Sequence, residues 1–128
     1  MTDPLLPRIA QIELHCTDQE EARRFYCEVL GLEKVGEFAH NLFVKCGDSN
    51  LLIQKVDNPR KGSVVYFSAD NRIHEVANSL KKRGVEFTEE PSCIARGFEG
   101  KDIWLGFFDD PWGNPLALLA EMPMEDKE

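Results

Sequence analysis

The fold is decided by one stretch of sequence, residues 11–31, which reads QIELHCTDQEEARRFYCEVLG. Apolar and polar side chains alternate in its first six positions. The apolar members are Ile12, Leu14 and Cys16, and the polar members are Gln11, Glu13 and His15. Because successive side chains leave a strand on opposite faces, this alternation predicts a strand with one buried face and one polar face.

A helix is predicted directly after this strand. Asp18 stands three positions before Glu21, a capping-box spacing in which the Asp18 side chain accepts hydrogen bonds from the N–H groups at a helix start. Apolar residues then recur at helical spacing, namely Ala22, Phe25, Tyr26, Val29 and Leu30. Gly31 follows them and predicts the end of the helix, because glycine adopts the left-handed conformation of a helix stop without strain.

The same strand and helix return after the middle of the chain. Val65, Phe67 and Ala69 form the apolar face of a second predicted strand, and Val64, Tyr66 and Ser68 form its other face. Asp70 is expected to begin a second helix and Gly84 to end it. Asp70 lies 52 positions after Asp18, and Gly84 lies 53 positions after Gly31. This near-constant offset indicates an internal duplication.

Each predicted helix is followed by three strand-like segments. They are residues 32–38, 41–46 and 50–56 in the first half, and residues 85–89, 102–108 and 115–121 in the second half. Residues 57–62 are predicted to link the halves, and residues 90–101 to form a long irregular loop that acts either as a flexible lid or as a plain connection. We therefore expect one domain, residues 1–128, made of two units at about residues 8–56 and 63–122.

Composition excludes several classes of partner. The 128 residues carry a formal net charge of −8, which opposes binding to nucleic acid or to an anionic membrane surface. No apolar run approaches the roughly 20 residues that a membrane span needs. The sequence Met-Thr-Asp-Pro at the start lacks the basic and apolar regions of a signal peptide, so we expect a cytoplasmic location.

Two phrases of the sequence resemble the vicinal oxygen chelate superfamily, which includes glyoxalases, bleomycin resistance proteins and extradiol dioxygenases. Residues 18–32 fit the pattern D-x-x-x-A-x-x-F-Y-x-x-x-L-G-L, and residues 108–114 fit the pattern F-x-D-P-x-G-N. The resemblance covers about residues 8–122. It implies an α+β fold in which two βαβββ units form a curved, cup-like mixed sheet, with the helices on the convex side and a ligand on the concave side.

The resemblance also raises the question of a metal, because metal-dependent members place one ligand on each of four strands. Carried over position by position, the four sites are Gln11, Leu52, Val64 and Ala117. Alkyl side chains have no lone pair to donate, so only Gln11 could bind a divalent ion. A shift of one residue places further apolar residues or Ser63 at the other three corners. We therefore expect no metal and no other cofactor, which puts the metal-dependent activities of the family in doubt.

The alternation of each strand assigns the residues that should line the concave face. They are Gln11, Glu13, His15, Leu52, Val64, Tyr66, Ala117 and Leu119. Glu13 should either bind a cation or hydrogen-bond donor of the ligand, or be held by Arg96 or a water molecule. His15 is either a general base or a hydrogen-bonded surface histidine, and Tyr66 is the expected pocket aromatic.

Three functions remain open at this point. The lost metal positions favour a metal-free binding protein that encloses a small organic molecule, for instance to sequester a drug or metabolite. The second is a metal-dependent lyase or dioxygenase of the glyoxalase type with a displaced metal site, and the third is a non-catalytic interaction subunit. We also expect a homodimer, because short curved sheets expose edges that association covers.

Overall fold

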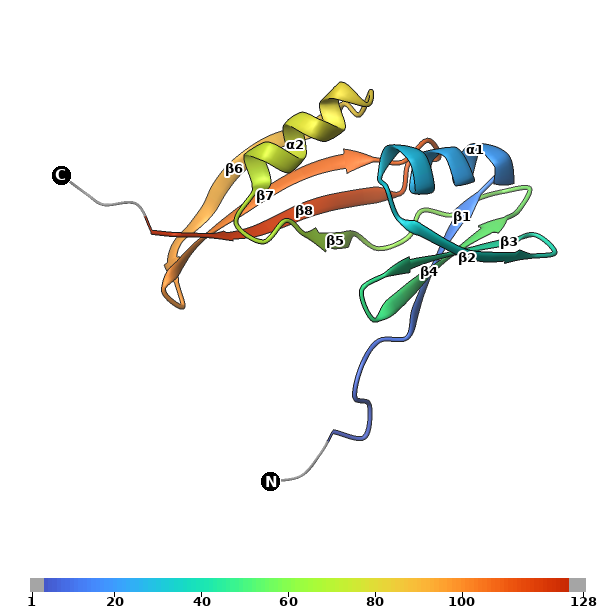
Figure 1. Ribbon diagram of the computed structural model, residues 1–128, viewed down its shortest axis with the longest axis horizontal. Helices are drawn as coiled ribbons and strands as arrows, with labels where there is room; N and C mark the ends of the chain where they lie inside the picture. The colour runs from blue at the N-terminus through green and yellow to red at the C-terminus, as the bar shows by residue number, and fades with distance from the viewer. Residues whose placement is uncertain (1–3, 125–128) are drawn as a thin grey trace. The chain divides into compact units, whose positions relative to one another are not determined.

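Two βαβββ units follow one another in the computed structural model, which describes residues 4–124 (Figure 1). The first unit ends at Gly62 and the second begins at Ser63. Each unit has its own four-stranded mixed sheet and its own helix. The predicted α+β fold built from two βαβββ units is therefore confirmed. No helix within residues 4–124 is long and apolar enough to span a membrane.

The first unit consists of six elements. They are β1 (Gln11–Cys16), α1 (Gln19–Arg23), the π-helical segment η1 (Arg24–Val29), β2 (Glu33–Phe38), β3 (Asn41–Cys46) and β4 (Ser49–Lys55). The strand order in the sheet is β1-β4-β3-β2. β1 runs parallel to β4, and the other neighbours are antiparallel. β2, which follows the helical segment, is thus an edge strand. The parallel pair of β1 and β4 joins the first and last strands of the unit.

The core of the first unit lies between this sheet and α1, which packs against β3 and β4. Its strand residues are buried at alternate positions, namely Leu14, Cys16, Leu42, Val44, Leu51 and Ile53. Their neighbours Glu13 and His15 lie on the opposite face, where they are exposed or half-buried. The alternation predicted for the first strand is therefore confirmed.

The first helix begins as the sequence predicts and ends differently. The Asp18 side chain accepts a hydrogen bond from the backbone N–H of Glu21 at 3.0 Å, which is the expected cap. After Arg23 the chain widens into η1, where the Leu30 N–H donates to the Phe25 carbonyl at 2.9 Å, five residues back. Gly31 then takes a left-handed φ of 80° and ends the segment. The spacing of apolar residues in the sequence does not distinguish a π-helical segment from an α-helix, so the sequence did not predict η1.

The second unit consists of five elements. They are β5 (Val65–Ser68), α2 (Ile73–Lys82), β6 (Phe87–Phe98), β7 (Lys101–Asp109) and β8 (Pro115–Met122). The strand order is β5-β8-β7-β6, with β5 parallel to β8 and the other pairs antiparallel. α2 packs against β6 and β8. Buried residues on the helix side of this sheet are Val65, Phe108, Leu116, Leu118 and Ala120.

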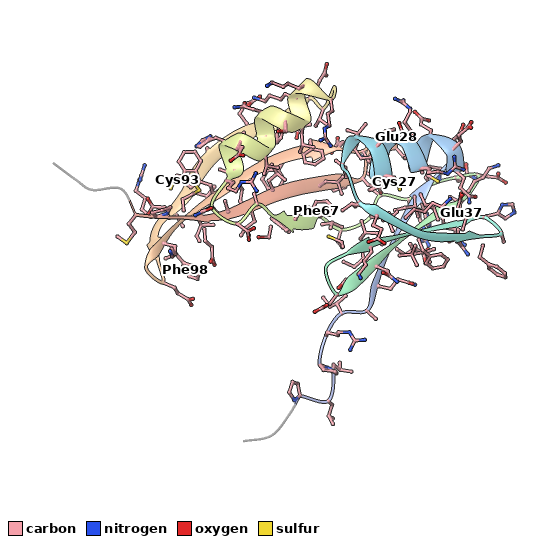
Figure 2. The ribbon with its side chains drawn as sticks, in the orientation of Figure 1. Cys27, Glu28, Glu37, Phe67, Cys93 and Phe98 are labelled. Carbon is pink, nitrogen blue, oxygen red and sulfur yellow. The ribbon has the colours of Figure 1, made fainter. Side chains whose placement is uncertain are left out.

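The predicted loop at residues 90–101 is wrong, because β6 continues through Phe98 and only a short turn precedes β7. The register between β6 and β7 shifts at four places, so the pattern of period two is interrupted along the strand. Pro91 lies in one of these irregular stretches, and Gly106 in β7 gives it room: a Cβ on Gly106 would meet Pro91 Cγ at 3.0 Å. Figure 2 shows Phe98 at the end of β6.

The predicted start of the second helix at Asp70 is also wrong. The helix begins at Ile73, and its N-cap is Arg72, which makes no side-chain capping hydrogen bond. Asp70 instead adopts a left-handed φ of 53° and turns the chain between β5 and α2. Asp tolerates this conformation better than most residues, so the same residue type fits a turn as well as a cap.

Candidate functional site

In the first unit, the predicted site residues share the face of the sheet that is turned away from α1. In the register of the sheet, Glu13 pairs with Leu52, and Leu52 pairs with Phe43 on β3. Gln11 lies two positions before Glu13, on the same face, and is exposed. Phe43 was not among the predicted site residues, although the alternation of residues 41–46 places it on this face. The structure thus brings a carboxylate, an amide and two apolar side chains onto one surface.

His15 is hydrogen-bonded through both ring nitrogens. Its Nδ1 accepts the backbone N–H of Arg60 at 3.1 Å, so Nδ1 carries no proton in this arrangement. The proton of the neutral ring therefore lies on Nε2, which donates to Glu13 Oε2 at 3.1 Å. The His15 side chain is 16% exposed and that of Glu13 is 50% exposed. His15 is thus a hydrogen-bonded residue that orients Glu13, and the arrangement leaves it no free lone pair for a base.

Arg96 has a carboxylate partner within its own unit. Arg96 donates to Asp102 Oδ2 at 3.1 Å within the second unit. Asp102 is 2% exposed and also accepts the backbone N–H of Gly97 at 2.9 Å. These contacts stabilise the turn between β6 and β7.

A buried polar atom without a partner lies on the same face of the first unit. Asn41 on β3 pairs with Gln54 on β4, which pairs with His15 on β1, so a polar row crosses three strands. Asn41 Oδ1 is buried and accepts no hydrogen bond in the described part of the chain. Leaving such an acceptor unsatisfied costs on the order of 1 to 3 kcal/mol.

In the second unit, the predicted site residues also lie on the face turned away from the helix. Tyr66 on β5 pairs with Ala117 on β8, which pairs with Phe107 on β7. The rings of Tyr66 and Phe107 are 6.2 Å apart between centroids and inclined at 74°. Ala117 is on the predicted face and fully buried, and in the register of the sheet it lies between Tyr66 and Phe107. Tyr66 itself is 50% exposed.

The remaining predicted residues extend this aromatic surface. Leu119 lies two positions after Ala117 on β8, and it pairs with Ser68 on β5 and with Leu105 on β7. Val64 lies just before β5, which begins at Val65, and is 37% exposed. Phe107 was missed as a site residue, and only its register with Ala117 shows that it completes the pair with Tyr66.

Comparison with known proteins identifies the family. The model of the Glyoxalase/Bleomycin resistance protein/Dioxygenase superfamily matches residues 8–118.

The chain belongs to this superfamily.

Solved structures of glyoxalase-type proteins share the fold of this superfamily member. A protein assigned to the glyoxalase family from Bacillus anthracis is 24% identical, with a TM-score of 0.74, and the match covers 94% of this chain and 99% of that one. A glyoxalase/bleomycin resistance protein/dioxygenase from Alicyclobacillus acidocaldarius is 17% identical, with a TM-score of 0.73 and coverage of 89% and 91%. A lactoylglutathione lyase from Agrobacterium tumefaciens is 23% identical, with a TM-score of 0.70 and coverage of 88% and 92%. No curated protein matches the sequence. Such distant likeness establishes the fold and leaves the reaction open.

The residues at the four metal positions of the superfamily do not fit a metal ion in this member. Leu52 and Val64 offer only alkyl groups, and Ala117 offers only a methyl group and is fully buried. Gln11 alone has a donor oxygen at such a position. Within residues 4–124, no group of three or more His, Cys, Asp and Glu side chains is close enough to hold a metal ion.

Proposed function

We propose that this superfamily member is a metal-free protein that binds a small organic molecule on the faces of its sheets turned away from the helices. Drug or metabolite sequestration is the biological role that such binding would serve. The proposal includes a cytoplasmic location.

One observation carries this proposal: the position of the last metal ligand is an alanine buried between Tyr66 and Phe107. A carboxylate at this position would be placed against two aromatic rings, where its desolvation is costly. The same rings give an organic ligand an apolar surface with a defined edge-to-face geometry. The substitution of a metal ligand by an apolar contact therefore favours binding of an organic molecule over Lewis-acid chemistry.

The first unit supports the proposal with polar groups that can orient a ligand. The Glu13 carboxylate is held by His15 and remains half exposed, so it can accept a hydrogen-bond donor or a cation. Gln11 is exposed on the same face, and its amide can donate and accept hydrogen bonds. Small-molecule pockets commonly combine a largely apolar lining with a few such polar groups.

Two measurements on the purified protein test this function. Native mass spectrometry of the protein as purified should show a bound organic molecule that is released on denaturation. Elemental analysis after dialysis should show well below one Zn, Fe, Mn, Ni or Co per chain. A near-stoichiometric metal that is removed by chelation and restores an activity on return would contradict the proposal and support the metal-dependent enzyme.

A further inference from the structure

A hollow of about 480 Å³ lies within the second unit, beyond the aromatic pair. It is lined by Ser68, Asp70, Asn71, Lys101, Leu119 and Glu121. These residues come from the end of β5, the turn before α2, the start of β7 and the end of β8. None of them belongs to the sites discussed so far except Leu119.

Opposite charges face this hollow without pairing. Glu121 on β8 pairs in register with Ile103 on β7, and Lys101 lies two positions before Ile103, so the two charged residues are diagonal neighbours on one face. No ion pair or hydrogen bond of either side chain is present within residues 4–124. Both charged groups are therefore available to a ligand.

A second carboxylate at the rim, that of Asp70, is held in place. The Ser68 hydroxyl donates to Asp70 Oδ1 at 3.3 Å and accepts the backbone N–H of Asp70 at 3.1 Å. The Asp70 carbonyl accepts the backbone N–H of Glu121 at 2.9 Å, which attaches the turn to β8. Asp70 Oδ2 accepts no hydrogen bond in the described part of the chain, so one oriented carboxylate oxygen remains unused.

The hollow continues the surface formed by the aromatic pair. Ala117, Leu119 and Glu121 occupy alternate positions of β8 and therefore share a face. Two residues along a strand span about 7 Å, and Leu119, which lines the hollow, lies two positions after Ala117. The hollow therefore begins about 7 Å along the strand from the rings of Tyr66 and Phe107. An apolar surface thus leads directly to a site with one cationic and two anionic groups.

We propose that this hollow binds the zwitterionic end of an aromatic α-amino acid or a close analogue. Lys101 would pair with the ligand carboxylate, Glu121 and Asp70 with its ammonium group, and the ring would lie against Tyr66 and Phe107. A ligand with a single charge satisfies only one side of the hollow and leaves the other charge unpaired. This inference rests on the proposed function, because it assigns a ligand class to part of the same face.

Isothermal titration of the full chain with three related probes tests this assignment. The probes are L-phenylalanine, phenethylamine, which lacks the carboxylate, and N-acetyl-L-phenylalanine, which lacks the ammonium. L-phenylalanine should bind about tenfold more tightly than either analogue, which corresponds to about 1.4 kcal/mol. Equal affinity of the three probes, or absence of binding by L-phenylalanine, would overturn the assignment.

Charge-removing variants locate the site. Glu121→Gln should reduce the preference of the protein for L-phenylalanine over N-acetyl-L-phenylalanine, because only Asp70 then remains for the ammonium group, and Lys101→Gln should remove its preference over phenethylamine. Both residues are exposed, so the variants should fold. Glu86→Gln and Lys82→Gln remove the same charges elsewhere in the second unit and should leave both preferences unchanged. Equal losses in these control variants would contradict a site at the hollow.

Failure of this assignment can be distinguished from failure of the proposed function. If 2-phenylethanol binds as tightly as L-phenylalanine, the zwitterion assignment is wrong, while binding of an organic molecule on this face stands. If the purified protein instead carries a stoichiometric catalytic metal, the proposed function fails whatever the three probes do.

Discussion

At the scale of single residues, the hydrogen bonds of His15 determine which of its nitrogens carries the proton. The Arg60 N–H occupies the Nδ1 lone pair, and the Glu13 carboxylate accepts from Nε2. The sequence allowed either a general base or a hydrogen-bonded histidine, and the structure supports the second. The hydrogen bond from Nε2 also orients the Glu13 carboxylate, so His15 and Glu13 act as a pair.

We expect His15 to populate the Nε2–H tautomer when it is neutral. Two-bond proton–nitrogen NMR correlation spectra at alkaline pH should show an unprotonated Nδ1 and a protonated Nε2. Glu13→Gln keeps an acceptor oxygen for Nε2–H, so it should preserve this tautomer and leave the melting temperature within about 1 °C, as is usual for exposed sites. A protonated Nδ1 in the wild-type protein would contradict the contact with Arg60.

At the scale of secondary-structure elements, one carboxylate joins the edge strand β2 to the helix α1. Figure 2 labels this residue, Glu37. It accepts hydrogen bonds from Arg23 at 3.2 and 3.3 Å, from Gln19 at 2.9 Å and from Lys34 at 3.2 Å. These contacts, that of Arg23 above all, lower the pKa of Glu37 from its ordinary value of 4.5 to about 2. No sequence pattern indicated this network, because Glu37 is 18 and 14 positions from Gln19 and Arg23.

We expect Glu37→Gln to lower the free energy of unfolding at pH 7, by an amount on the order of 1 kcal/mol for a partly exposed network. Because the folded-state pKa lies below the ordinary value, this stabilisation is present above pH 4.5 and is lost as the pH falls toward about 2. Urea unfolding at a series of pH values should therefore show the wild type and the variant converging in acid.

The matched control for this prediction is Glu33→Gln, which changes an exposed carboxylate of the same strand. It should leave the free energy of unfolding nearly unchanged at every pH. A difference between Glu37→Gln and the wild type that persisted below pH 2 would show that its cause is not the charge of Glu37.

At the scale of the whole molecule, each sheet has edge strands with exposed apolar side chains. In β2 these are Val35 and Phe38, which are 56% and 75% exposed, and in β6 they are Ile94 and Phe98, both 58% exposed. The segment before β1 adds Leu5, which is 96% exposed. Unpaired strand edges with apolar side chains favour association with another chain.

We therefore expect a homodimer at micromolar concentration. Size-exclusion chromatography with light scattering should give a mass near twice 14.6 kDa, about 29 kDa. Phe38→Ser and Phe98→Ser, made separately, should show which edge takes part, because removing an apolar anchor from an interface shifts the equilibrium toward monomer. A mass near 14.6 kDa for the wild type would contradict the expected dimer.

The sequence by itself determined the two βαβββ units and the faces of most strands. The alternation of Ile12, Leu14 and Cys16 and the cap at Asp18 depend on neighbours within one or two turns of chain, so they can be read locally. Together with the motif at residues 108–114, they also indicated the family. The resemblance to the family indicated which positions hold metal ligands in other members. The residue types alone then showed that Leu52 and Ala117 have no side-chain atom that could bind a metal.

Only the tertiary structure decided which residues meet across the sheets. The pair of Tyr66 and Phe107 over Ala117 depends on the register of three strands, and the contact of His15 with Arg60 joins residues 45 positions apart. The length of β6 likewise depended on its pairing with β7, because register shifts interrupt the alternation that identifies a strand. A local pattern specifies the face of each residue, whereas its partner is selected by hydrogen bonding between strands that are distant in the sequence.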